Sequence, residues 1–166
     1  MTNPTSGTEV RILPATVADV PVILELVKAL AAFEKLSHLV VATEDMLRKA
    51  LFGPRPQAEV VLAWRGDNAV GFALFFHNFS TFLGRRGLYL EDLFVRPEAR
   101  GLGIGKALLT HLGGIAKERN CGRYEWAVLD WNESAIRFYR SLGAQPLDDW
   151  TIMRVTGPAL DRIAEK

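Results

Sequence analysis

The sequence has little of what a disulfide-bonded, zinc-binding or membrane-spanning protein needs. Cys121 is the only cysteine among 166 residues, so no disulfide can form within the chain and a reducing compartment is favoured. The three histidines show no metal-ligand spacing, and no cysteine pair accompanies them. The longest apolar run, residues 70–76, is far shorter than the ~20 residues of a membrane span. We therefore expect a cytoplasmic protein with no bound metal and no membrane partner.

An excess of charge of one sign is also lacking. The chain carries 20 Lys and Arg against 19 Asp and Glu, a formal net charge of +1 at pH 7. This balance gives no electrostatic reason to expect a nucleic-acid partner. The opening residues MTNPTSGTEV have neither the basic start nor the apolar core of a signal peptide, and we expect residues 1–8 to be a flexible tail. The length fits one domain over residues 1–166, with a core that needs no covalent reinforcement.

Hydrophobic periodicity predicts the elements of the first half. A strand at 10–13 is followed by a helix within residues 16–36, whose start is marked either by a capping pair of Thr16 and Asp19 or by Pro21. Turn residues then separate strands of an antiparallel meander. The remaining predicted elements are a helix at 43–51 and strands at 59–64, 69–77 and 87–95.

The second half alternates helices and strands. A helix following a glycine-rich loop ends near Asn120, and a helix capped by Asn132 ends at Gly143. Strands are predicted at 124–129 and 150–155, and a short helix ends the chain. Together the two halves predict an α/β fold of the mixed α+β type: a central, largely antiparallel mixed sheet with helices on both faces.

The stretch FVRPEARGLGIGKALL, residues 94–109, places three glycines between a strand and a helix. Gly101, Gly103 and Gly105 lack a Cβ, so their backbone can adopt positive φ or approach a ligand closely. Arg100 precedes them and Lys106 follows. Bare amides, a helix N-terminus and flanking cations are the components of an anion site. The alternative is a turn that only reverses the chain.

Two common anion motifs do not fit this loop. The dinucleotide fingerprint G-x-G-x-x-G needs its third glycine three residues after the second, whereas Gly105 comes two after Gly103. The phosphate loop G-x-x-x-x-G-K-[ST] needs a wider glycine spacing, and Ala107 stands where it requires a hydroxyl. What remains is an R-x-x-G-x-G element, RGLGIG.

This element resembles the cofactor loop of the GNAT superfamily of N-acetyltransferases. The segments LYLEDLFVRPEARGLGIG, WNESAIRFYRSLGA and RILPATVADVPVILELVKAL extend the resemblance over nearly the whole chain, and they are similar to the spermidine/spermine branch. The resemblance implies a GNAT fold and acetyl-coenzyme A as cosubstrate, with its pyrophosphate on the loop amides and its pantetheine arm along the backbone of one strand. The cofactor-binding residues so implied are Leu93, Phe94, Val95, Arg100, Gly101, Leu102, Gly103, Ile104, Gly105, Lys106, Asn132, Ser134 and Ala135.

Two adjacent carboxylates, Glu91 and Asp92, interrupt an otherwise apolar strand. An alkylamine of pKa ~10.4 is neutral only about once in 10³ molecules at pH 7, so its acetylation benefits from a base. Alternation along the strand places the two side chains on opposite sides unless a bulge intervenes. One of them can instead be a surface residue or the partner of an arginine. The resemblance implies that Glu91 is the base, acting through water, and that Asp92 helps to bind the amine.

Tyr139 is the candidate acid. Helical spacing places Ala135, Tyr139 and Leu142 on one face, which is also the pattern of an aromatic packed in a core. A phenol of pKa ~10 can protonate a thiolate leaving group, and the acid tyrosine of the resembled family aligns with Tyr139. Because Cys121 lies outside every motif, we expect direct attack by the amine in a ternary complex.

The substrate segment departs from the polyamine pattern. The stretch FEKLSH, residues 33–38, keeps Glu34 as a substrate-binding carboxylate but has Lys35 and His38 where the spermidine/spermine branch is rich in acidic residues and tyrosines. We expect a small amine, either a diamine or polyamine or a lysine-like amino acid, with the latter favoured. The alternatives are a protein lysine or N-terminus, and a non-catalytic regulatory protein that binds acetyl-coenzyme A. The family resemblance also implies a homodimer.

Overall fold

The computed structural model describes residues 9–165, so the tail expected at residues 1–8 lies outside the described residues. The chain divides into two compact units, Met1–Ala127 and Val128–Lys166. The first unit contains the sheet and the helices α1, α2 and α3. The second contains two short helices joined by an extended segment. Within residues 9–165, no helix has the length and apolar character that crossing a membrane would require.

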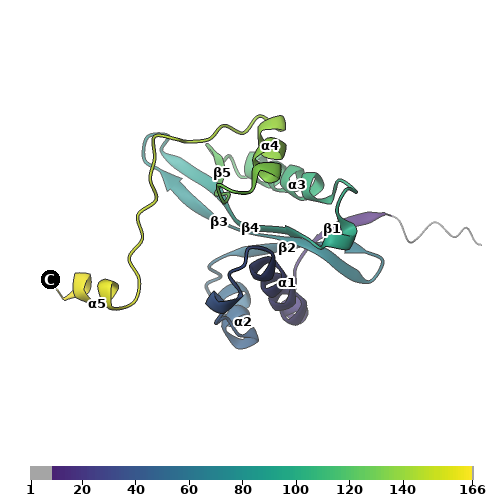
Figure 1. Cartoon of the computed structure of the whole chain (residues 1–166), viewed down its shortest axis with the longest axis horizontal. Coiled ribbons are helices and arrows are strands. Elements are labelled where there is room, and N and C mark those ends of the chain that lie inside the picture. The colour runs from purple at the N-terminus through teal and green to yellow at the C-terminus, as the bar shows by residue number, and fades with distance from the viewer. Residues whose placement is uncertain (1–8, 166) are drawn as a thin grey trace, which may run out of the picture. The chain divides into compact units, whose positions relative to one another are not determined.

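The first unit is built on a five-stranded sheet of order β1-β2-β3-β4-β5. The first four strands pair antiparallel, and β5 runs parallel to β4. Figure 1 shows α1 and α2 on one face of this sheet and α3 on the other, as the sequence predicts. The bounds are β1 Val10–Pro14, α1 Val20–Phe33, α2 Glu44–Phe52, β2 Glu59–Arg65, β3 Asn68–Ser80, β4 Arg85–Val95, α3 Ile104–Glu118 and β5 Tyr124–Trp126, with short 3-10 turns at Val17–Asp19, Ser37–Leu39 and Pro97–Ala99.

The start of α1 combines both predicted signals. The Thr16 backbone N–H and hydroxyl donate to Asp19 Oδ2 at 2.7 and 2.8 Å. The α-helix itself begins at Val20, with Pro21 in its first turn where a missing N–H is tolerated. The capping pair therefore organises the 3-10 turn that leads into α1, and the proline marks the helix that follows.

The core lies on both faces of the sheet. On the α1 face, a cluster of buried side chains comprises Ile23, Leu26, Leu51, Val60, Leu62, Ala69, Phe72 and Phe94. On the α3 side of the sheet, Leu108 and Leu112 of α3 are fully buried. Burial of each such side chain contributes roughly 1.5–3 kcal/mol, so β4 is held rigidly between two packed layers.

The second unit contains α4, Glu133–Ser141, and α5, Pro158–Ala164. The strand predicted at 150–155 is wrong, because these residues form neither strand nor helix. Trp150, Ile152 and Met153 are 79%, 75% and 87% exposed, and the described part of this unit offers no strand for them to pair with. The strand predicted at 124–129 is also too long: β5 ends at Trp126, opposite Leu90, immediately before an irregularity in β4.

Candidate active site

A β-bulge at Glu91 determines where the two strand carboxylates point. Leu74 of β3 pairs with Asp92, but the next residue, Phe75, pairs with Leu90, so Glu91 is an extra residue in β4. Directly opposed residues share a face of the sheet, which puts Asp92 with Leu74 on the α1 face. Leu90 shares the opposite face with Phe75, and its neighbour Glu91 therefore returns to the α1 face. The sequence predicts opposite sides for the two carboxylates unless a bulge intervenes, and the bulge found here places both on one side.

Three carboxylates interact on this α1 face. Asp92 is half-buried, Glu91 is exposed, and half-buried Glu34 is the C-cap that follows α1. Burial, and after it the negative charges of Glu91 and Glu34, together raise the pKa of Asp92 to about 6. Burial also raises the pKa of Glu34. We call Glu34, Glu91 and Asp92 the acidic face; among residues 9–165, no group of three such side chains is placed to hold a metal ion.

Arg100 connects the acidic face to the glycine loop. Its guanidinium carbon lies 4.6 Å from the ring centre of Phe33 in α1 and 5.6 Å from that of Phe94 in β4. Its Nε donates to the Val95 carbonyl at 3.0 Å. The sequence predicts Arg100 as a cofactor residue, but not its cation–π contacts, because only the fold brings Phe33 beside it.

The glycine loop has the backbone that its composition predicts. Gly101 and Gly103 have φ of 78° and 75°, a region that glycine enters without strain, and Gly103 is the N-cap of α3. A Cβ built at either position meets no atom within 4 Å, so protein packing does not explain these two glycines. Gly105 is different, since its Cβ would lie 3.9 Å from Val95 in ordinary contact.

The loop offers unused donors to an anion. Within residues 9–165, no backbone carbonyl accepts from the N–H groups of Leu102 or Gly103. Exposed Lys106 lies in the first turn of α3, where no acidic side chain opposes it. Open space, unpaired amides and a helix N-terminus fit the diphosphate group of a cofactor, so Gly101–Lys106 could hold one.

Beyond the bulge, β4 has an open edge. Its pairing with β5 ends at Leu90, so Leu93, Phe94 and Val95 have β3 on one side and no strand of the first unit on the other. Backbone groups at such an edge remain available to an extended ligand. The predicted pantetheine position is compatible with this geometry.

The other predicted residues belong to the second unit. Asn132 Oδ1 accepts from the Ala135 N–H at 3.2 Å, which confirms Asn132 as the cap of α4. Ser134 is exposed, and Tyr139 is half-buried with its ring centre 5.5 Å from that of Phe138. No residue of α4 is fully buried, so Tyr139 is not an ordinary core aromatic.

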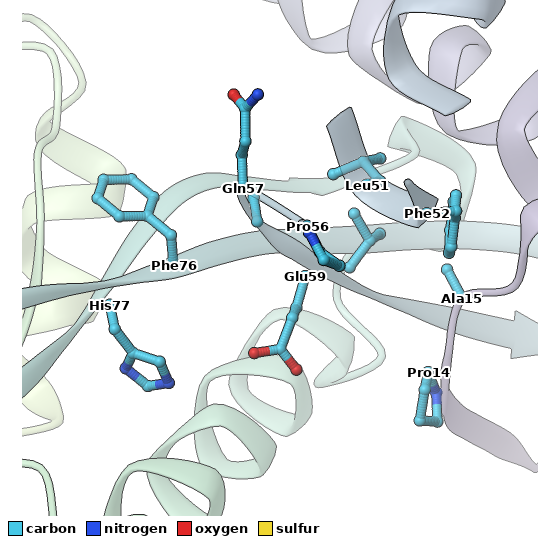
Figure 2. A pocket seen from close by; sticks show the side chains of 11 residues that line it. Pro14, Ala15, Leu51, Phe52, Pro56, Gln57, Glu59, Phe76 and His77 are labelled. Atoms are coloured by element: carbon cyan, nitrogen blue, oxygen red, sulfur yellow. The ribbon is translucent and has the colours of Figure 1, made fainter. Parts of the chain in front are cut away.

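A pocket of about 550 Å³ lies away from these residues, between the start of β2, the end of β1 and α2 (Figure 2). Glu59 and His77 extend to the same side of it in Figure 2. Arg119 joins them, donating to Glu59 Oε2 at 2.8 Å and to His77 Nε2 at 2.9 Å. His77 Nδ1 donates to the Gly87 carbonyl at 2.9 Å, so both ring nitrogens serve structural contacts. None of the predicted site residues lines this pocket.

Comparisons with known proteins identify the family of this chain. Residues 26–144 match the model of the acetyltransferase (GNAT) family. The chain is 37% identical to L-ornithine N5-acetyltransferase NATA1 of Arabidopsis thaliana, over 92% of this chain and 87% of that one. It is 38% identical to mouse (Mus musculus) thialysine N-epsilon-acetyltransferase, over 93% of this chain and 96% of that one.

A solved structure supports the fold. An integron cassette protein from the mobile metagenome of V. cholerae superposes with a TM-score of 0.78 at 28% identity, covering 96% of this chain and all of that one. The predicted fold class is confirmed, and both curated relatives named above are N-acetyltransferases. The chain belongs to the GNAT family of acetyltransferases, whose cosubstrate is acetyl-coenzyme A.

Proposed function

We propose that this acetyltransferase acetylates a small primary amine that carries a second positive charge. The observation that carries the proposal is the acidic face, where Glu34, Glu91 and half-buried Asp92 lie together and the pKa of Asp92 is raised. Partly desolvated carboxylates that repel one another are stabilised when an ammonium group enters. Arg100 links this face to the loop proposed to bind the cosubstrate.

The glycine loop is proposed to hold the cosubstrate. Gly101–Lys106 would bind its pyrophosphate through amides and the N-terminus of α3, and the edge of β4 at Leu93–Val95 would bind its pantetheine arm. When bound, the cosubstrate supplies an activated acetyl group. The protein must then orient the amine, accept its proton and protonate the departing sulfur.

Proton transfer is proposed to involve one carboxylate and one phenol. The amine gives up a proton to the carboxylate pair at the bulge, where the family resemblance implies Glu91 as the base and Asp92 as an amine ligand. Tyr139 is proposed as the acid that protonates the thiolate, with direct attack in a ternary complex. Half-buried Tyr139 and the capped start of α4 support this assignment, because both give the phenol a defined setting.

The substrate is proposed to be a lysine-like amino acid rather than a long polyamine. Two relatives are named for ornithine and thialysine, amino acids that carry a side-chain ammonium. Here the acidic face supplies partners for one or two ammonium groups, whereas spermine carries four. Exposed Lys35, next to Glu34, opposes a further cation and suits a carboxylate.

A panel of amines tests the proposal. Coenzyme A release is measured with ornithine, thialysine, lysine, a simple diamine, spermidine and spermine, and with a peptide that offers a lysine and an N-terminus. We expect the highest kcat/KM with an amino acid of the first group. A clear preference for spermine would contradict the substrate assignment, and turnover of the peptide alone would favour the protein-acetylating alternative.

We also propose that the enzyme is a cytoplasmic homodimer. Exposed Trp150, Ile152 and Met153 lie in a segment whose sequence has strand character, and a partner copy could cover them. The free thiol of Cys121 is compatible with a reducing compartment. Sedimentation of the wild type and of a Trp150→Ser, Ile152→Ser variant tests the dimer, which the double variant should weaken.

A further inference from the structure

The two carboxylates at the bulge have different surroundings, although they share a face. Glu91 is exposed, whereas Asp92 lies two residues from buried Phe94 and opposite Leu74, which packs against the core. Water therefore solvates Glu91 well and Asp92 poorly. A carboxylate that is poorly solvated binds a proton more readily than one in water.

The groups around Asp92 strengthen this difference. Glu34 reaches it from the end of α1 and Glu91 from its own strand, both with negative charge. Arg100 is packed near this cluster, but its guanidinium stacks over Phe33 and Phe94 and donates to the Val95 carbonyl. No hydrogen bond or cation from residues 9–165 compensates the charge of Asp92.

We propose that Asp92, and not Glu91, is the catalytic residue that accepts the ammonium proton of the substrate. In this step an N–H bond of the ammonium breaks, the proton moves to a carboxylate oxygen of Asp92, and the electron pair stays on nitrogen for attack on the acetyl carbon. The side chains of Glu34 and exposed Glu91 hold the substrate's positive charge. The inference rests on the proposed function, and it exchanges the roles that the family resemblance gives to the two strand carboxylates.

The chemistry favours this assignment because a base works best when its pKa lies near the working pH. Burial and its two acidic neighbours bring the pKa of Asp92 to about 6. It is then largely ionised at pH 7, yet a far stronger proton acceptor than an ordinary aspartate of pKa ~3.9.

The test compares two isosteric variants, Asp92→Asn and Glu91→Gln, by the pH dependence of kcat/KM with the best amine of the panel. For the wild type we expect an acid limb centred near the pKa of Asp92, about 6. Asp92→Asn should lose this limb, fall on the order of 10²-fold or more at pH 7, and gain about tenfold per pH unit towards the amine pKa. Glu91→Gln should keep the limb and shift it to lower pH, because a like charge has been removed.

Two further measurements keep the test decisive. Asp92→Glu, which retains a carboxyl, should restore an acid limb that Asp92→Asn lacks, and thermal melting checks that all variants fold. The proposal is supported only if the limb is lost in Asp92→Asn and kept in Glu91→Gln; any other pattern overturns it and leaves the amine acetyltransferase intact. Absence of coenzyme A release from the wild type with every amine would instead overturn the proposed function and this inference together.

Discussion

The glycine loop and the acidic face are joined by Arg100, and they differ in charge and in exposure to solvent. The loop is open and electropositive, with two glycines at positive φ ahead of a helix N-terminus. The acidic face is partly desolvated and electronegative, with Asp92 set against the core. One is suited to a phosphate and the other to an ammonium. The contrast fits the proposed reaction, in which the negatively charged pyrophosphate of the cosubstrate and the positively charged amine bind at separate places.

Breaking the loop should have the largest effect. Gly103→Val places a side chain in the open space before α3 and should weaken acetyl-coenzyme A binding on the order of 10²-fold or more, measured by calorimetry. Gly84→Val is the matched control, because Gly84 also has positive φ and an unobstructed Cβ direction but lies in the β3–β4 turn. Each variant should lose ~1–2 kcal/mol of stability from backbone strain. Equal acetyl-coenzyme A affinity in the two variants would show that the loop does not bind the cofactor.

Tyr139→Phe tests the proposed acid, which belongs neither to the glycine loop nor to the acidic face. Removing the phenolic proton should lower kcat on the order of 10²-fold with little change in acetyl-coenzyme A affinity. Tyr89→Phe is the control within the acidic region: Tyr89 is half-buried, and burial together with the charges of Glu91 and Glu125 raises its pKa. If Tyr89→Phe lost turnover and Tyr139→Phe did not, the acid would belong to β4.

The free energy of unfolding of the protein should depend on pH through Asp92 of the acidic face. Because the pKa of Asp92 is raised to about 6 in the folded state, the native protein retains a proton that the unfolded chain releases near pH 4. The stability present below pH 4 is therefore lost as pH rises to about 6 and above, by on the order of 2–3 kcal/mol. Asp92→Asn should be more stable than the wild type at pH 8 and nearly equal to it at pH 4.

Urea unfolding at the two pH values measures this difference. Asp45→Asn is the control, because exposed Asp45 pairs with Lys49 and its pKa is lowered rather than raised. This substitution should bring no gain at pH 8. A wild type whose stability rises from pH 4 to pH 8 by as much as that of Asp92→Asn would show that Asp92 is well solvated.

The two regions also differ in how far the sequence predicts them. Glycine spacing specifies local backbone conformation, so the loop and its helix follow from RGLGIG alone. The facing of Glu91 and Asp92 depends on the register between β3 and β4, which shifts by one residue at Leu74, and no local pattern marks that shift. The contact of Arg100 with Phe33 joins residues far apart in the chain. Residues 150–155 have the composition of a strand, but the described part of their unit contains no other strand with which they could form hydrogen bonds.

The smallest expected effect belongs to the residue that joins the two regions. Arg100→Lys keeps a positive charge beside the loop but removes the planar group that stacks on Phe33 and Phe94, an interaction of about 0.5–2 kcal/mol. If Arg100 serves mainly as this structural link, KM should rise several-fold for both the amine and acetyl-coenzyme A, with kcat less affected. Arg11→Lys, which alters an exposed contact with the Gly66 carbonyl, should change neither value. A rise confined to acetyl-coenzyme A would show that Arg100 acts as a phosphate ligand alone, and that the acidic face keeps its geometry without it.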